Sequence, residues 1–212
     1  MNIVDAKANA YAEQYSTPED ALLTEVAAYT NARPGANMMS GHLQGKLLEM
    51  ISCMVRPGKI LEIGTFTGYS ALCLAKGLQE GGALHTIELN KEQGSVAQGF
   101  FDRSFFRDQI ILHIGNALEI IGELDETWDL VFLDADKGNY INYFNLVFSR
   151  LSAKGFILAD NVLFHGEVLE DEITGKTAKA IQAFNEMILG RTNIEKLMLP
   201  VRDGLYLIRK SK

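Results

Sequence analysis

After residue 56, short apolar runs alternate along the chain with longer segments in which apolar residues recur at helical spacing. The apolar runs fit buried strands at residues 59–63, 83–88, 109–114, 130–134 and 156–160. The helical patterns follow or separate these strands at residues 69–78, 91–104, 117–122, 140–151 and 176–189. Alternation of this kind is typical of βαβ units, so the pattern predicts a mostly parallel sheet covered by helices.

The two ends of the chain have different patterns. Helical periodicity covers the N-terminal part, at residues 5–15, from Ser16-Thr17-Pro18 onward, and at residues 40–54. Two strand patterns, 194–200 and 204–210, are joined by the short turn Arg202-Asp203-Gly204, which predicts a hairpin. We therefore expect an α/β fold, Rossmann-like and doubly wound, with a mostly parallel seven-stranded sheet, an antiparallel C-terminal strand and N-terminal helices.

Length and composition narrow the class of protein. The 212 residues fit a single domain, which we divide into a helical segment, 1–56, and a core, 57–212. The formal net charge of −7 argues against nucleic acid as a partner, because phosphate binding needs a basic field, and it favours a small-molecule ligand. No segment approaches about eighteen uninterrupted apolar residues and no signal peptide is evident, so we expect no membrane contact and a cytoplasmic location. Cys53 and Cys73 lack metal-ligand spacing and fit reduced core thiols.

The stretch KILEIGTFTGYS, residues 59–70, places two glycines where the first predicted strand turns into a helix. The dinucleotide fingerprint G-x-G-x-x-G uses its second glycine to let a pyrophosphate approach the backbone. Here Phe66 stands where that second glycine would be, between Gly64 and Gly68. Glu62 adds a negative charge before the turn, so this stretch is poorly suited to a pyrophosphate.

Acidic residues stand in or next to the ends of four of the five predicted parallel strands: Glu62, Glu88, Asp134 and Asp160. Each one taken alone fits a helix cap or an Asx turn. Doubly wound sheets bind ligands beyond the carboxyl ends of their strands, so the four acids together predict a rim that attracts cations.

The second of these acids indicates an adenosine-type ligand. Glu88 lies 24 positions after Gly64, near the spacing at which an acid accepts hydrogen bonds from ribose hydroxyls. A ligand with adenosine, positive charge and no pyrophosphate fits this combination, and S-adenosylmethionine has these properties. The small residues Gly115-Asn116-Ala117 would leave room for an adenine ring, although Gly-Asn is also an ordinary turn.

The stretches FLDADKGNY and ADN predict an oxygen-rich cation site. Asp134 closes the fourth predicted strand, and Asp160 and Asn161 close the fifth. Two carboxylates and an amide on adjacent strand ends suit Mg²⁺, and no Cys or His cluster indicates zinc. Lys137 is close enough in sequence to reach a metal-bound hydroxyl; a surface lysine or a partner of Asp136 is the alternative interpretation.

In order and spacing, EIGTFTGYS, IELN, GNA, FLDADK and ADN resemble the class I S-adenosylmethionine-dependent O-methyltransferases of the metal-dependent catechol and caffeoyl-CoA type. The resemblance runs from about residue 38 to the C-terminus, and FLDADK with ADN is its specific part. It implies Mg²⁺, or another divalent ion such as Mn²⁺ or Ca²⁺, at Asp134, Asp160 and Asn161. It also implies cofactor contacts with Met39, Ser40, Glu62, Gly64, Thr65, Phe66, Ser70, Glu88, Leu89, Asn116, Ala117 and Asp134.

The implied reaction moves a methyl group from S-adenosylmethionine to a hydroxyl of a catechol-type small molecule, such as a phenylpropanoid or a flavonoid. Asp134 and Lys137 would be catalytic, with Lys137 as the general base. A base must be neutral: burial and a nearby ion would lower the pKa of Lys137, and the acidic rim would raise it. The acceptor would meet Met38, Lys137, Phe164 and His165, although a lone histidine also fits a loop residue without a chemical role.

The resemblance also implies a homodimer. Two other interpretations stay open at this point: a noncatalytic S-adenosylmethionine-binding or regulatory module, and a nucleotide-dependent oxidoreductase, which the glycine spacing and Glu62 disfavour.

Overall fold

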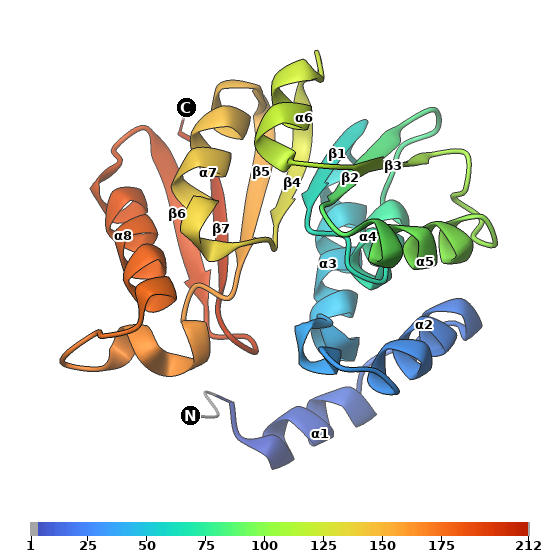
Figure 1. Ribbon diagram of the computed structural model, residues 1–212, viewed down its shortest axis with the longest axis horizontal. Helices are drawn as coiled ribbons and strands as arrows, with labels where there is room; N and C mark the ends of the chain where they lie inside the picture. The colour runs from blue at the N-terminus through green and yellow to red at the C-terminus, as the bar shows by residue number, and fades with distance from the viewer. Residues whose placement is uncertain (1–3, 212) are drawn as a thin grey trace.

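In the computed structural model, which describes residues 4–211, seven strands form one mixed sheet with helices on both faces (Figure 1). The strands are β1 (Lys59–Ile63), β2 (Ala83–Glu88), β3 (Ile110–Ile114), β4 (Trp128–Leu133), β5 (Leu151–Asp160), β6 (Ile194–Leu199) and β7 (Leu205–Lys210). Their order in the sheet is β3-β2-β1-β4-β5-β7-β6. Strands β1 to β5 are parallel, and β7 is antiparallel to both β5 and β6. The predicted fold class and the C-terminal hairpin are therefore confirmed.

The helices precede, connect and follow the strands in the expected alternation. They are α1 (Ala6–Gln14), α2 (Ala21–Asn31), α3 (Gly41–Val55), α4 (Tyr69–Ala75), α5 (Lys91–Phe101), α6 (Ala117–Glu123), α7 (Tyr140–Ser149) and α8 (Lys176–Gly190). Three 3-10 helices lie in the connections: η1 (Ala36–Met38), η2 (Lys137–Asn139) and η3 (Phe164–Leu169). Within residues 4–211, none of these helices is long and apolar enough to cross a membrane.

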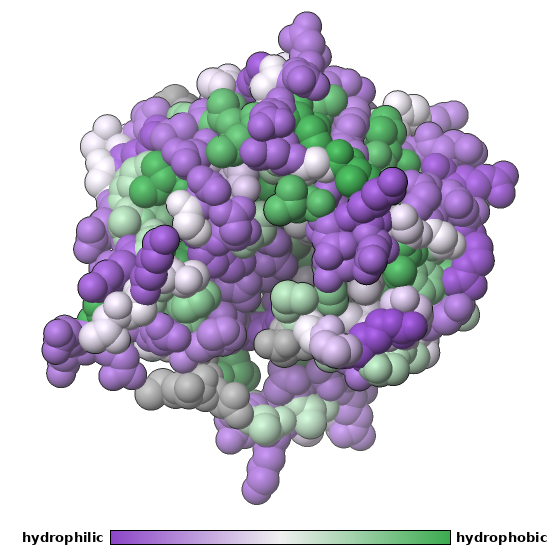
Figure 2. All heavy atoms as spheres, in the orientation of Figure 1, coloured by the Kyte–Doolittle hydropathy of each residue, from purple (hydrophilic) through white to green (hydrophobic). Residues whose placement is uncertain are grey.

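Two buried apolar clusters cover the two faces of the sheet. Strand side chains alternate between the faces, so β1 gives Leu61 and Ile63 to the cluster under α6, α7 and α8, and Ile60 to the cluster under α3, α4 and α5. Burial on both faces explains why the parallel strands read as nearly continuous apolar runs. On the face drawn in Figure 2, hydrophilic residues predominate, and hydrophobic residues gather mainly in its upper part.

Several predicted element boundaries are wrong, and two of the differences have a clear physical cause. The second helix does not begin at Ser16-Thr17-Pro18, because Asp20 caps α2 by accepting a hydrogen bond from the backbone N–H of Leu23 at 2.9 Å. The Asp20 carboxylate satisfies one of the unpaired N–H groups of the first turn, so the helix begins at Ala21, three residues after the proline. Strand β5 begins five residues earlier than expected, at Leu151, because it pairs with Trp128 before a shift in register.

The strand order places a topological switch point between β1 and β4. The chain runs from β1 outward to β2 and β3 on one side, and then returns to β4 and β5 on the other. Loops that leave the carboxyl ends of β1 and β4 therefore turn in opposite directions and leave a crevice between them, where doubly wound proteins bind ligands.

Candidate functional site

A cavity of about 660 Å³ lies at the carboxyl ends of the strands beside this switch point. Sixteen of the predicted site residues line it: Met38, Met39, Ser40, Gly64, Thr65, Phe66, Ser70, Glu88, Leu89, Asn116, Ala117, Asp134, Lys137, Asn161, Phe164 and His165. The predicted cofactor, metal and acceptor residues therefore share one cavity. Glu62 and Asp160, also predicted, are fully buried behind its wall.

The turn between β1 and α4 brings the backbone close to the neighbouring strand. Gly64 has φ +100°, and a Cβ at this position would lie 2.0 Å from the carbonyl oxygen of Asp134. Only glycine fits such an approach. Gly68, which caps α4, also has a positive φ of +88°, so both glycines of the motif are needed by the backbone.

Glu88 holds the same turn from the end of β2. Its two carboxylate oxygens each accept a backbone hydrogen bond at 2.8 Å, from Phe66 and from Asn90. The side chain is nearly buried but lines the cavity. A carboxylate fixed in this way retains lone pairs for further donors, which is what binding of a ribose requires.

Glu62 lies away from the cavity, in contrast to its predicted contact with the cofactor. Its position in β1 directs it to the interior, where it accepts a hydrogen bond from the Thr86 hydroxyl. Burial is the main cause that raises the pKa of Glu62 to about 8, against the opposing hydrogen bonds from Ser70 and Thr86. At neutral pH its carboxyl group therefore holds a proton and adds no full negative charge to the turn.

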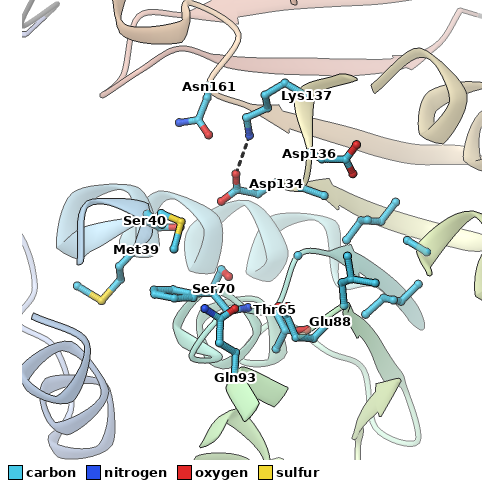
Figure 3. A pocket seen from close by; sticks show the side chains of 18 of the residues that line it. Met39, Ser40, Thr65, Ser70, Glu88, Gln93, Asp134, Asp136, Lys137 and Asn161 are labelled. Carbon is cyan, nitrogen blue, oxygen red and sulfur yellow. Dashed lines mark hydrogen bonds and ion pairs between the residues drawn. The ribbon is translucent and has the colours of Figure 1, made fainter. Parts of the chain in front are cut away.

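Asp134 and Lys137 form an ion pair at the cavity wall. Lys137 Nζ lies 2.9 Å from Asp134 Oδ1 and donates a hydrogen bond to the Tyr140 hydroxyl at 2.7 Å. Figure 3 shows Lys137 extending towards Asp134, with the side chain of Asn161 beside it. Burial alone would lower the pKa of Lys137, but Tyr140, Asp134 and Asp160 raise it above its ordinary value. The sequence alone does not decide between these opposing effects on the pKa of Lys137. In this structure the lysine is an ammonium.

Asp160 is held by a residue that the sequence reading missed. Gln44 of α3 is buried, and its Nε2 donates to Asp160 Oδ2 at 2.6 Å. Asp160 Oδ1 accepts from the backbone N–H of Asn161 at 2.8 Å. Burial and Asp134 raise the pKa of Asp160, against the effects of Lys137, Gln44 and Arg202. A buried carboxylate beside a second carboxylate favours a cation at this place.

Tyr140, the first residue of α7, fixes the distance between the two acidic strand ends. Its hydroxyl lies 3.0 Å from the carbonyl oxygen of Leu133 and 3.0 Å from that of Asp160, so its single hydrogen can be donated to either or shared between them. The same hydroxyl accepts from Lys137. One buried side chain thus connects β4, β5 and the lysine.

Backbone strain is concentrated in the loops that line the cavity. Among the described residues, six that are not glycine have a positive φ, and five of these line the cavity: Phe66, Asn161, Phe164, His165 and Arg202. Asp203 ties two of the strained loops together, because its Oδ1 accepts from the backbone N–H of His165 at 2.5 Å. Strained backbone persists where surrounding contacts hold it, commonly at ligand sites.

Partial signals in the sequence mark the residues that the predictions do not include. Gln44 is a polar residue among the apolar positions of α3, and Tyr140 directly follows the predicted FLDADK loop. Arg202 and Asp203 were recognised only as a hairpin turn. None of these signals identifies a partner, because each contact joins residues that are distant in sequence or depend on loop geometry.

The donor set fits a hard cation. Within residues 4–211, no three His, Cys, Asp or Glu side chains are grouped as a metal site. The predicted set has a different composition, with the carboxylates of Asp134 and Asp160 and the amide of Asn161. The ammonium of Lys137 already lies against Asp134, which shows that this corner accepts positive charge. Carboxylate and amide oxygens are the ligands that Mg²⁺ prefers.

Two solved structures that share this fold are methyltransferases. The SAH-bound Podospora anserina methyltransferase PaMTH1 superimposes with a TM-score of 0.90 and 29% identity, over 97% of this chain and 94% of that one. The O-methyltransferase TomG from Streptomyces achromogenes, in complex with SAM, superimposes with a TM-score of 0.86 and 27% identity, over 97% of this chain and 96% of that one. Together with the cavity at the switch point, the fold defines a class I methyltransferase.

Sequence comparisons identify the family. A model of the O-methyltransferase family matches residues 13–211. The chain is 34% identical to the catechol O-methyltransferase of Niastella koreensis, over 85% of this chain and 83% of that protein. It is 30% identical to caffeoyl-CoA O-methyltransferase 2 of Populus trichocarpa, over 92% of this chain and 83% of that protein. The chain belongs to the O-methyltransferase family, which confirms the resemblance and the predicted enzyme class.

Proposed function

We propose that this enzyme transfers a methyl group from S-adenosylmethionine to one hydroxyl of a catechol-type small molecule, with the help of a divalent metal ion. The observation that carries the proposal is the arrangement of Asp134, Lys137 and Asn161 on the wall of the same cavity that contains the Gly64 turn. SAH and SAM in the two solved relatives support the cofactor. The names of the catechol and caffeoyl-CoA relatives support the acceptor class.

The cofactor would lie between the β1–α4 turn and the end of β2. Glu88 is placed to accept hydrogen bonds from a ribose, because its oxygens are already fixed by the turn. Ala117 and Asn116 border the cavity with short side chains, which suits an adenine ring. Asp134 would face the positively charged methionine end of the cofactor as well as the metal site.

Asp134, Asp160 and Asn161 would hold the metal ion. When bound, a divalent ion would act as a Lewis acid and lower the pKa of the acceptor hydroxyl. Gln44 and the backbone N–H of Asn161 keep Asp160 oriented, and Tyr140 keeps the ends of β4 and β5 at a fixed separation. These residues thus position the groups that would hold the metal ion, and they form no covalent bond with the acceptor.

Lys137 would take the proton of the acceptor hydroxyl. In this structure Lys137 Nζ is protonated and donates hydrogen bonds to Asp134 and Tyr140. It can act as a base only after it loses that proton. Asp134 is one of the groups that raise the pKa of Lys137, so drawing the charge of Asp134 towards another cation would lower this pKa again.

Methyl transfer to caffeic acid tests the proposal. The protein is incubated with S-adenosylmethionine and caffeic acid, with Mg²⁺ and then with EDTA, and products are read by mass. We expect one added methyl group with Mg²⁺ and at least about 100-fold less product with EDTA. Undiminished transfer in EDTA would contradict the metal role, and a bound cofactor without any transfer would contradict the acceptor class.

We also propose that residues 1–212 act as one catalytic domain and that the enzyme is a homodimer in the cytoplasm. Light scattering of the purified protein tests the dimer, because a mass of one chain would contradict it.

A further inference from the structure

Arg202 brings a positive charge to the acceptor side of the cavity. It lies in the loop between β6 and β7, is partly buried and lines the cavity near Phe164 and His165. Its φ is +52°, a conformation that glycine adopts freely and that strains other residues. A large charged residue kept in a strained turn at a cavity wall indicates a role for its side chain.

The arginine lies close to the predicted metal ligands. Its Nη1 is 3.5 Å from Gln44 Oε1, and Gln44 donates to Asp160 from its other terminal atom. The amide therefore has its oxygen towards the arginine and its nitrogen towards the carboxylate. Because the catechol hydroxyls would meet the metal ligands, a substituent on the catechol ring would lie within reach of this side of the cavity.

Charge on the cavity wall is uneven. The lining contains the acidic residues Glu88, Asp134, Asp136 and Asp203. Two of the described cavity residues are lysine or arginine: Lys137, which pairs with Asp134, and Arg202, which contacts Gln44. An anionic substituent on an acceptor would therefore be repelled by most of the wall and attracted at Arg202.

We propose that Arg202 binds a carboxylate on the acceptor, so that this enzyme prefers catechols that carry a free acid group. The planar guanidinium suits a carboxylate because it offers paired N–H donors. The inference rests on the proposed function, since it assumes that a catechol binds in this cavity, and it adds the class of acceptor.

The test compares two probes that differ only at the acid group: 3,4-dihydroxybenzoic acid and its methyl ester. Affinity is measured by calorimetry in the presence of SAH and Mg²⁺, and kcat/KM for methyl transfer is measured separately. The variant Arg202→Gly removes the side chain and fits the observed φ, so it should fold. The matched control is Arg56→Gly, because Arg56 has φ +51° and lies outside the cavity.

For the unchanged protein we expect the acid to bind at least about 10-fold more tightly than the ester. Arg202→Gly should lose about 10- to 100-fold in affinity and in kcat/KM for the acid, the range for a lost charge-assisted hydrogen bond, and less than about 3-fold for the ester. Arg202→Lys should lose less, because it keeps the charge. Arg56→Gly should change the affinity and kcat/KM for either probe by no more than about 2-fold.

Equal effects of Arg202→Gly on both probes, or no preference for the acid in the unchanged protein, would overturn the inference. Methyl transfer to both probes without preference would overturn it and leave the proposed function intact. Binding of the acid that depends on Arg202, without any methyl transfer, would support the carboxylate site and contradict the proposed function. Binding of neither probe would contradict both.

Discussion

The two parts of the cavity that we propose to bind the cofactor and the acceptor, called here the cofactor half and the acceptor half, are built in different ways. The cofactor half consists of strand ends and a tight glycine turn, in which Gly64 approaches the backbone of Asp134 and Glu88 holds the turn. The acceptor half consists of loops after β5 and between β6 and β7, where Asn161, His165 and Arg202 have left-handed backbone conformations. In the first half, positive φ angles fall on glycines and on one other residue, Phe66, whereas in the second half they fall mainly on residues other than glycine, where they strain the backbone.

This difference separates two tasks. A cofactor that is the same in every reaction can be met by regular elements and a fixed turn. An acceptor must be distinguished from similar molecules, and loops can change side chains without moving the sheet. Substitutions in the first half should therefore affect folding and every acceptor, and substitutions in the second should affect some ligands more than others.

The largest effect is expected from Gly64→Ala. The new Cβ would meet the carbonyl oxygen of Asp134 at 2.0 Å, and φ is +100°. We expect a loss of at least about 3 kcal/mol in the free energy of unfolding and a loss of SAH binding. Urea denaturation and calorimetry measure the two quantities.

Gly81→Ala is the matched control, because Gly81 has φ +73° and nothing lies within 4 Å of a new Cβ. It should lose only about 1 kcal/mol, the cost of the backbone conformation. Similar losses in the two variants would show that the close approach to Asp134 is unimportant.

An intermediate effect is expected from Gln44→Leu, which removes the donor to Asp160. Residues that orient metal ligands typically change metal affinity about 10- to 100-fold, so we expect a loss in this range for Mn²⁺. Calorimetry with the metal alone measures it, and SAH affinity should change less than the affinity for the metal.

Gln98→Leu is the control, since Gln98 donates to Asp102 in the same manner on the exposed side of α5. An unchanged metal affinity in Gln44→Leu would show that Gln44 does not orient Asp160 for metal binding.

The smallest effect at low pH is expected from Glu62→Gln, and this effect grows as the pH rises. The pKa of Glu62 is raised from an ordinary value of 4.5 to about 8 in the folded protein, mainly by burial. The stability that this group contributes is fully present below about pH 4.5 and is lost as pH rises through 8.

Relative to Glu62→Gln, the unchanged protein should therefore lose on the order of 1 kcal/mol of stability per pH unit between these limits. Urea midpoints from pH 5 to pH 9 measure the difference. Parallel pH profiles in the two proteins would mean that Glu62 is ionised in the fold.

The cofactor half was largely predictable from the sequence. The spacing of Gly64 and Gly68 after an apolar run indicated the turn, and Glu88 and Asp134 stood at the expected strand ends. These signals are local, because a strand end and its turn are adjacent in the chain. Even here, burial was not predictable: Glu62 reads as a charge beside the turn, but neighbouring elements enclose it.

The acceptor half was less predictable because its contacts join distant residues. Gln44 and Asp160 are 116 positions apart, and Gln44 and Arg202 are 158 apart. A glutamine in a helix and an arginine in a turn have no sequence signature for such pairing. The left-handed backbone of His165 and Arg202 is equally hidden, because local preference favours glycine at such positions.

The position of β7 within the sheet has a consequence for biosynthesis. Strand β6 is made before β7, yet among the described strands it pairs only with β7, which lies between it and β5. The five parallel strands can begin to associate while the chain is still being made, whereas β6 must wait for its neighbour. Asp203 and Arg202 lie between these two strands, and Leu205 pairs with Asp160. We therefore expect that, during synthesis, the half proposed to bind the methyl donor can assemble before the half proposed to bind the acceptor.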